Sequence, residues 1–196
     1  MSMEEGKMDK KSVHEAINRM QIEDSLRQEF EGTLPNRVSR YLQVKPHPII
    51  GNTHFAAISS ECRYLHRDGH YYGCIALTQA VAEALVKFLC SKNSWRPKNT
   101  FETNVKKLSE RGVILEEAKE HLDRIWENRD DYHHLNPNIE KDREKLEGLA
   151  KEKLLSLNYI EGEVFAFSIV EGKVMPKYPR YWDISDNKAN VFLRFE

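Results

Sequence analysis

Apolar residues recur every three or four positions through most of the chain, which is the spacing of helices with one apolar face. The most apolar stretch runs from Tyr71 to Cys90, and its polar residues Gln79, Glu83 and Lys87 recur every four positions. Those three residues form one narrow strip on an otherwise apolar cylinder. The pattern therefore predicts a central helix that is covered on most sides.

Further helices are expected on both sides of this central one. Their expected ranges are 13–31 after a Ser12 cap, Thr53 to about Arg67, Thr100 to about Arg111, about Leu115 to Asn128, and Asn136 to about Leu157. Asn136 and Pro137 have the residue types of an N-cap and a first helical position. Residues 32–52 contain three prolines and two glycines. This composition predicts that the first helix ends near Gly32 and Pro35 and that a connection follows.

The hydrophobic period changes after Ile160. Residues 164–170 are rich in β-formers, and residues 171–173 have the composition of a turn. The strand-like pattern then resumes at residues 174–175, before Pro176. This predicts a β-hairpin, with a further strand over 191–195. The expected fold class is all-α, an up-and-down bundle of about five helices with an extra N-terminal helix and a small C-terminal β-hairpin extension. The expected organisation is 1–52 for the N-terminal helix and Pro-rich connection, 53–158 for the bundle and 159–196 for the β extension.

Composition and charge limit the partners and the cell compartment that we expect for the protein. The net charge is −1, so no global field attracts nucleic acid or membrane, and any contact with nucleic acid needs a local patch. The cysteines Cys62, Cys74 and Cys90 lack metal-ligand spacing and are expected as buried free thiols in a reducing compartment. The N-terminus has no apolar core of a signal peptide, and no window has the roughly 18 consecutive apolar residues of a membrane span. A cytoplasmic protein without membrane contact is expected.

One charged residue falls on an apolar stripe. The stripe Ala118, Leu122 and Ile125, which begins at Leu115, reaches Arg129 after one more step of four. Burying an unpaired charge is costly, so this arginine needs a partner or faces a cleft. A simple pair with Glu127, Asp130 or Asp131 at the helix end is the plainer alternative.

Two histidines follow within five residues of Arg129. In an uninterrupted helix His133 would lie about 40° around the axis from Arg129 and His134 about 140°. The Asn136-Pro137 cap implies a break near residues 130–132, and such a break can turn His134 back toward Arg129. The spacing alone leaves the choice between His133 and His134 open. Both can also be surface histidines of a loop.

An arginine and a histidine in one cleft suit the cleavage of an RNA phosphodiester. The histidine can take the proton of a 2′-hydroxyl or protonate the leaving oxygen, and the guanidinium can bind the phosphate as its charge grows. No metal is needed, and DNA lacks the nucleophile. Asp130, Asp131 and the two histidines have the composition of a metal site, but their spacing matches no common zinc motif. No metal or other cofactor is therefore expected.

The run from Arg129 to His134 resembles the Arg-X4–6-His signature of the HEPN superfamily (higher eukaryotes and prokaryotes nucleotide-binding domains). In that family a polar residue follows the arginine, as Asp130 does here. The motif lies between the third and fourth helices of a helical bundle, and the family's central second helix is similar to the Tyr71–Cys90 stretch with its Glu83. The resemblance covers roughly residues 53–158.

The resemblance implies a metal-independent endoribonuclease that acts on single-stranded RNA in a defence, toxin–antitoxin or RNA-processing system. It implies a homodimer in which two motifs form one composite cleft, and a protein antitoxin is a further potential partner. By position, Arg129 would bind the phosphate, His134 would be the acid or base and Asp130 would support them, with His133 as the alternative histidine.

A second function class is a non-catalytic HEPN-like dimer that binds a nucleotide or a partner protein through the same arginine. The near-neutral net charge favours this second class, because such a charge attracts the phosphates of RNA only weakly. In the C-terminal tail, Tyr178, Tyr181 and Trp182 most simply pack in the core or an interface, with a base-stacking platform as the alternative.

Overall fold

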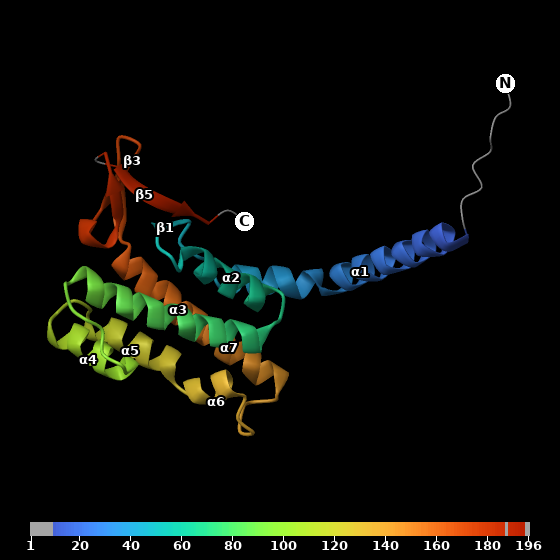
Figure 1. Ribbon diagram of the computed structural model, residues 1–196, viewed down its shortest axis with the longest axis horizontal. Coiled ribbons are helices and arrows are strands. Elements are labelled where there is room, and N and C mark those ends of the chain that lie inside the picture. The colour runs from blue at the N-terminus through green and yellow to red at the C-terminus, as the bar shows by residue number, and fades with distance from the viewer. Residues whose placement is uncertain (1–9, 187, 195–196) are drawn as a thin grey trace. The chain divides into compact units, whose positions relative to one another are not determined.

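The structure of the protein is a computed structural model that describes residues 10–186 and 188–194 (Figure 1). The chain divides into two units, Met1–Ser39 and Arg40–Glu196. The predicted mostly helical fold with a small antiparallel β part at the C-terminal end is confirmed.

The first helix is longer than predicted. Helix α1 spans Lys10–Gln43 and continues through Gly32 and Pro35, where we expected it to end. Proline inside a helix costs about 3 kcal/mol and glycine about 1 kcal/mol, but neither forbids the helix. The i, i+4 spacing of Leu34, Val38 and Leu42 carries the helical pattern past the proline. The large apolar side chains of α1 are exposed.

The second unit is a bundle around α3 (Figure 1). Its helices are α2 (Ala56–Arg67), α3 (Tyr71–Lys92), α4 (Phe101–Glu110), α5 (Glu116–Trp126), α6 (Arg129–His134) and α7 (Arg143–Val164). Helix α3 contacts all the other five, which confirms its predicted central place. By length and composition alone α3 could also cross a membrane, but more than half of its most apolar window is buried inside the protein, as for the core helix of a bundle.

The start and end of α7 differ from the prediction. Asn136 and Pro137 do not begin a helix; α7 begins at Arg143, and the Asp142 side chain accepts the backbone N–H groups of Glu144 and Lys145 at 3.0 Å. The Asn136 side chain donates instead to Asp131 Oδ1 at 3.1 Å. Asn136 therefore bonds back to α6 and does not cap the start of a following helix. At its other end α7 continues past residue 157 to Val164, because its apolar residues keep helical spacing.

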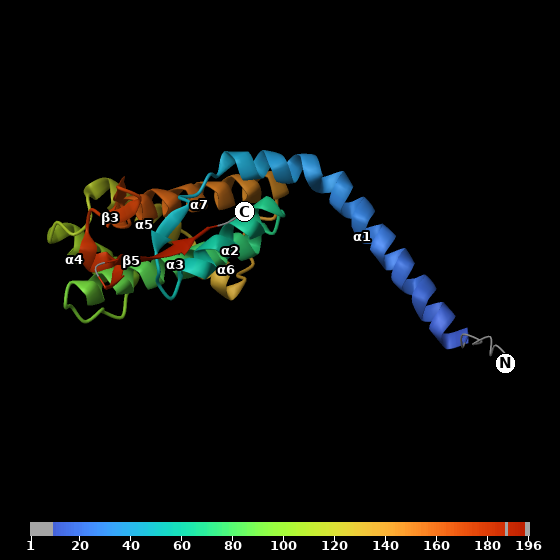
Figure 2. The same ribbon diagram turned by 90° about the horizontal axis from the view of Figure 1, so that it is seen from above.

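Small antiparallel sheets lie over one side of the bundle, the side that faces the viewer in Figure 2. The predicted hairpin is confirmed as β2 (Phe167–Val170) and β3 (Lys173–Pro176). The other sheet has the order β1 (Ile49–Gly51), β5 (Lys188–Leu193) and β4 (Asp183–Ser185). The expected last strand thus begins earlier than predicted, and β1 lies in the stretch expected to be a connection. Gly51 allows this packing, since a Cβ atom there would lie 2.8 Å from the Phe165 ring.

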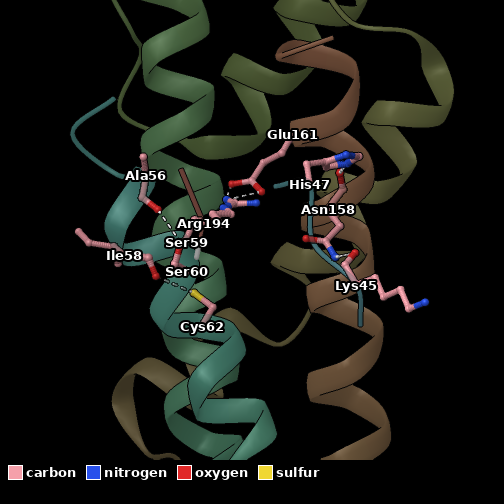
Figure 3. A network of polar contacts seen from close by, with 10 residues as sticks. All are labelled: Lys45, His47, Ala56, Ile58, Ser59, Ser60, Cys62, Asn158, Glu161 and Arg194. Atoms are coloured by element: carbon pink, nitrogen blue, oxygen red, sulfur yellow. Dashed lines mark hydrogen bonds and ion pairs between the residues drawn. The ribbon is translucent and has the colours of Figure 1, made fainter. Parts of the chain in front are cut away.

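A buried polar network fastens the last strand to the bundle (Figure 3). Arg194 Nη2 donates to Glu161 Oε2 on α7 and to Ser59 Oγ on α2, both at 2.7 Å, and the Arg194 and Glu161 side chains are fully buried. Ser59 also donates to Glu161 Oε1. The pairing of the charges offsets the cost of removing them from water. Strand β5 is therefore joined to two helices as well as to its own sheet.

The cysteines are free and buried, as predicted. Burial raises the pKa of the Cys74 thiol to about 12, and it also raises the pKa of Cys62 and Cys90. A thiol with a raised pKa is a poor nucleophile and a poor metal ligand at neutral pH. These residues therefore act as small core side chains.

Candidate functional site

The stretch around Arg129 is divided between two helices. The apolar stripe is confirmed at Ala118, Leu122 and Ile125, which are buried, whereas Leu115 precedes α5 and is 63% exposed. Helix α5 ends at Trp126, and Arg129 begins the short helix α6. The stripe therefore does not continue to Arg129 as one helix face.

Backbone conformation marks both ends of α6. Asn128 before it and Leu135 after it have positive φ angles of 56° and 52°. Asparagine tolerates this region, but a leucine there is unusual and costs about 1–2 kcal/mol. Leu135 is also 70% exposed, so apolar burial does not offset that cost. The chain therefore holds α6 as a separate turn at an energetic cost.

Two buried side chains hold the end of α5. Lys153 Nζ on α7 donates to the carbonyl oxygens of Arg124, Ile125 and Glu127, each at 2.9 Å. Gln79 Nε2 on α3 donates to the same oxygens of Ile125 and Glu127, at 3.1 and 3.3 Å. A cation is favourable at a helix C-terminus, where carbonyl groups lack partners in the helix. We call this pair of residues the α5 clamp; it fixes the point from which the chain turns into α6.

The inner face of α6 is formed by Tyr132, which is buried. Its ring lies 6.3 Å from that of Tyr72 on α3, and the Tyr72 hydroxyl donates to Glu140 O at 2.8 Å. Burial raises the pKa of Tyr132 above its ordinary value. Tyr132 thus anchors the six-residue helix against the bundle and sets the direction of its other side chains.

Arg129 lies against an aromatic stack. Its guanidinium carbon is 5.2 Å from the centre of the Trp126 ring, and that ring stacks on Phe101 at 4.0 Å. Arg129 Nη1 donates to Asp130 Oδ1 at 2.9 Å, in an ion pair whose aspartate is largely exposed. Among the described residues, the buried Nε of Arg129 has no hydrogen-bond partner. The arginine is thus positioned but incompletely satisfied.

The two histidines have different environments. His133 is four residues after Arg129 on the same helix, so the two share one face, and His133 is half-buried, whereas His134 is exposed. Burial lowers the pKa of His133 below its ordinary 6.5, and the charge of Arg129 lowers it further, whereas Glu83 on α3 acts in the opposite direction. Within the described part of the chain, the buried Nε2 of His133 also has no hydrogen-bond partner.

A small pocket opens beside Arg129. Its volume is about 230 Å³, and it is lined by Glu102, Trp126, Asn128, Arg129, Asp130 and Asp131. Glu102 accepts the indole N–H of Trp126 at 2.8 Å. Three carboxylates thus surround one guanidinium. The pocket of a single chain is acidic overall, and it contains neither histidine.

The structure brings together Arg129, Asp130 and His133, and it leaves His134 facing solvent. Among the described residues no group of three or more His, Cys, Asp or Glu side chains is placed to hold a metal ion. Sequence reasoning missed the aromatic support from Trp126 and the α5 clamp. Lys153 follows a run of mixed acidic and basic residues, a pattern that favours a solvated face, although its positions relative to Ala150 and Leu157 put it on the apolar stripe of α7. That spacing was the signal that could have identified it.

No protein-family model, no curated protein and no solved structure matches the chain.

Proposed function

We propose that the protein is a metal-independent endoribonuclease of the HEPN type, which cleaves single-stranded RNA as a homodimer in a defence or toxin-like system. The observation that supports this most is the pairing of Arg129 with His133 on one face of α6, where each has a buried nitrogen that lacks a hydrogen-bond partner among the described residues. An unsatisfied buried N–H costs about 1–3 kcal/mol. Such a group suits a ligand or a second chain that completes it, although other buried atoms of the described chain, such as Nε of Arg194, also lack a partner.

The proposed reaction uses the RNA's own 2′-hydroxyl. The neutral His133 takes the 2′-hydroxyl proton, O2′ bonds to phosphorus and the P–O5′ bond breaks, which leaves a 2′,3′-cyclic phosphate and a 5′-hydroxyl. The guanidinium of Arg129 stabilises the negative charge that grows on the phosphoryl oxygens. A protonated histidine gives its proton to O5′.

His134 is the candidate for that acid. The resemblance to the family assigns the acid or base role to His134, whereas burial and proximity to Arg129 favour His133. Because His134 is exposed, it is accessible to an RNA strand or to a cleft shared with a second copy. In the proposal the composite cleft of the dimer joins both histidines to two arginines, which offsets the acidic lining of the single pocket.

The test is cleavage of single-stranded RNA in EDTA by the wild type and by Arg129→Ala, His133→Ala and His134→Ala. Matched controls are Arg19→Ala, in an exposed pair on α1, and the exposed His54→Ala. We expect Arg129→Ala to lose about 100-fold or more in rate, as for loss of one donor to a developing oxyanion. At least one histidine variant should fall as far, and both controls should be unchanged. Full activity in all three site variants would refute the proposal.

The acidic pocket favours a second candidate, a non-catalytic HEPN-like dimer that binds a nucleotide or a partner protein. Here Asp130 keeps Arg129 in place, and Glu102 and Asp131 repel a polyanion from it. This candidate predicts a dimer of twice 23.0 kDa that does not cleave RNA at any enzyme concentration. It also predicts that Asp130→Asn leaves RNA cleavage absent.

A further inference from the structure

A second pocket lies at the other end of α5. It has a volume of about 430 Å³, which is in the range of small-molecule sites, about 300–1,000 Å³. Its walls come from the α3–α4 and α4–α5 loops, α7 and the 3-10 turn η1 (Pro179–Tyr181). Helix α5 has 11 residues and is therefore about 16 Å long, so this pocket is separate from the site at α6. We call it the aromatic–arginine pocket.

Aromatic rings and arginines line this pocket together. Trp95, Tyr178 and Tyr181 contribute the rings, and Arg111 and Arg180 contribute exposed cations. Tyr178 and Tyr181 of the tail thus line a cavity, although Tyr181 is itself buried in the core, as Trp182 from the same predicted platform is. Rings of this kind stack on a flat heterocycle, a contact worth about 1–3 kcal/mol per base.

Arg111 and Arg180 both have N–H donors that remain available to a ligand. Arg180 Nη1 donates to Asn93 Oδ1 at 2.8 Å, and its guanidinium lies 5.6 Å from the Tyr181 ring centre. Arg111 lies 5.6 Å from the ring centre of Trp95. A guanidinium has five N–H donors, so each arginine keeps several for an anion. Two arginines beside aromatic walls fit a ligand that has a ring at one end and a phosphate at the other.

One carboxylate completes the lining. Glu163 on α7 is half-buried, and its carboxylate has no hydrogen bond or ion pair with any described side chain. An ionised carboxylate only accepts hydrogen bonds. Guanine presents two adjacent donors, N1–H and the N2 amino group, to such an acceptor. Adenine presents one donor beside an acceptor nitrogen, which the carboxylate would repel.

We propose that the aromatic–arginine pocket binds a guanine nucleotide. The base lies against the rings of Trp95 and Tyr178, Glu163 accepts its N1–H and N2–H groups, and Arg111 and Arg180 bind the phosphate. This site does not depend on the RNA cleavage proposed at α6. It provides a place where a mononucleotide, or a guanosine of a longer strand, is recognised by its base.

The test is calorimetric titration of the full chain with GMP, AMP, guanosine and inorganic phosphate. We expect GMP to bind about tenfold or more tightly than AMP, because one charge-assisted hydrogen bond is at stake. Glu163→Gln should reduce this preference for guanine to less than about threefold. The double variant R111A/R180A should weaken GMP about tenfold or more and leave guanosine unchanged. Lys106→Ala, an exposed cation outside the pocket, is the matched control and should bind GMP as the wild type does.

Three results would overturn the proposal. They are no GMP binding at millimolar concentration, equal affinity for GMP and inorganic phosphate, or unchanged GMP binding in both Glu163→Gln and R111A/R180A. The substituted arginines are exposed, so folding should be retained, and thermal melts verify it. A chemical-shift change of the Trp95 indole N–H on adding GMP, assigned with Trp95→Phe, locates the ligand independently. Arg129→Ala should bind GMP normally, so failure of the RNA cleavage hypothesis and failure of this one are distinguishable.

Discussion

Methionine substitutions of Lys153 and Gln79 test how the protein holds the end of α5. Both side chains are fully buried and donate to the same carbonyl oxygens, those of Ile125 and Glu127. Methionine keeps an unbranched chain of similar length but removes the donor. The substitutions therefore remove hydrogen bonds with little change in packing volume.

The expected loss can be worked out from the shared partners. Lys153→Met leaves Arg124 O without the lysine donor, while Gln79 still serves the other two oxygens. One unsatisfied buried carbonyl costs about 1–3 kcal/mol, so we expect a loss of about 2 kcal/mol in the free energy of unfolding. Gln79→Met should cost about 1 kcal/mol or less, since its buried Oε1 has no partner among the described residues.

The double variant tests most directly whether the two side chains share their acceptor oxygens. With both donors removed, the oxygens of Ile125 and Glu127 have no side-chain donor left among the described residues, and the loss should exceed the sum of the single losses by about 1–2 kcal/mol. Urea unfolding at pH 7, followed by circular dichroism, measures all four free energies. Additivity within about 0.3 kcal/mol is typical of independent sites and would refute the shared clamp.

Other predictions concern charge, strain and pH. Burial lowers the pKa of Lys153 from 10.5 to about 8. Between these two pH values the lysine is protonated in the unfolded chain and neutral in the folded protein, so the free energy of unfolding should rise from pH 8 to pH 10.5. The Lys153→Met variant should not show this rise. Because burial lowers the pKa of His133 below 6.5, the rate of RNA cleavage at pH 6.5 should be more than half of its plateau value, and a rate at or below half would contradict His133 as the base. Leu135→Gly removes the strain of a positive φ, whereas Leu135→Ala keeps it, so the glycine variant should be more stable than the alanine variant by about 1 kcal/mol; equal melting temperatures of these two variants would count against the strain. Arg194→Met leaves the Glu161 charge buried and should cost about 3–5 kcal/mol, and adding Glu161→Leu should recover at least half of it in urea unfolding.

Local sequence pattern predicted most of the helices. The apolar spacing of α2, α3, α4 and α5 is set by residues three or four apart, so it is visible without knowledge of the fold. The pattern was less informative where distant segments decide. Strand β1 forms because Ile50 pairs with Phe192, and no local signal in the proline-rich stretch indicates that partner. Asn136 was misread because its side chain bonds backward to Asp131 instead of forward into a helix.

The candidate site was partly predictable. The position of Arg129 one step past a core stripe drew attention to it, although the chain breaks before it at Asn128. The break and the restart of a helix at Arg129 put His133 on the arginine's face, which spacing alone could not decide. Buried Lys153 was missed because a lysine among alternating charges is typical of a solvated face, and only the packing of α7 against α5 reveals its three carbonyl partners.

The most direct measurement of the central hypothesis is the initial rate of cleavage of a single-stranded RNA in EDTA by the wild type and by Arg129→Ala. We expect the wild type to release 2′,3′-cyclic phosphate ends, and the variant to be slower by about 100-fold or more while remaining folded. An Arg129→Ala protein that cleaves as fast as the wild type, or a wild type that leaves all RNA intact, would contradict an RNA-cleaving site at α6.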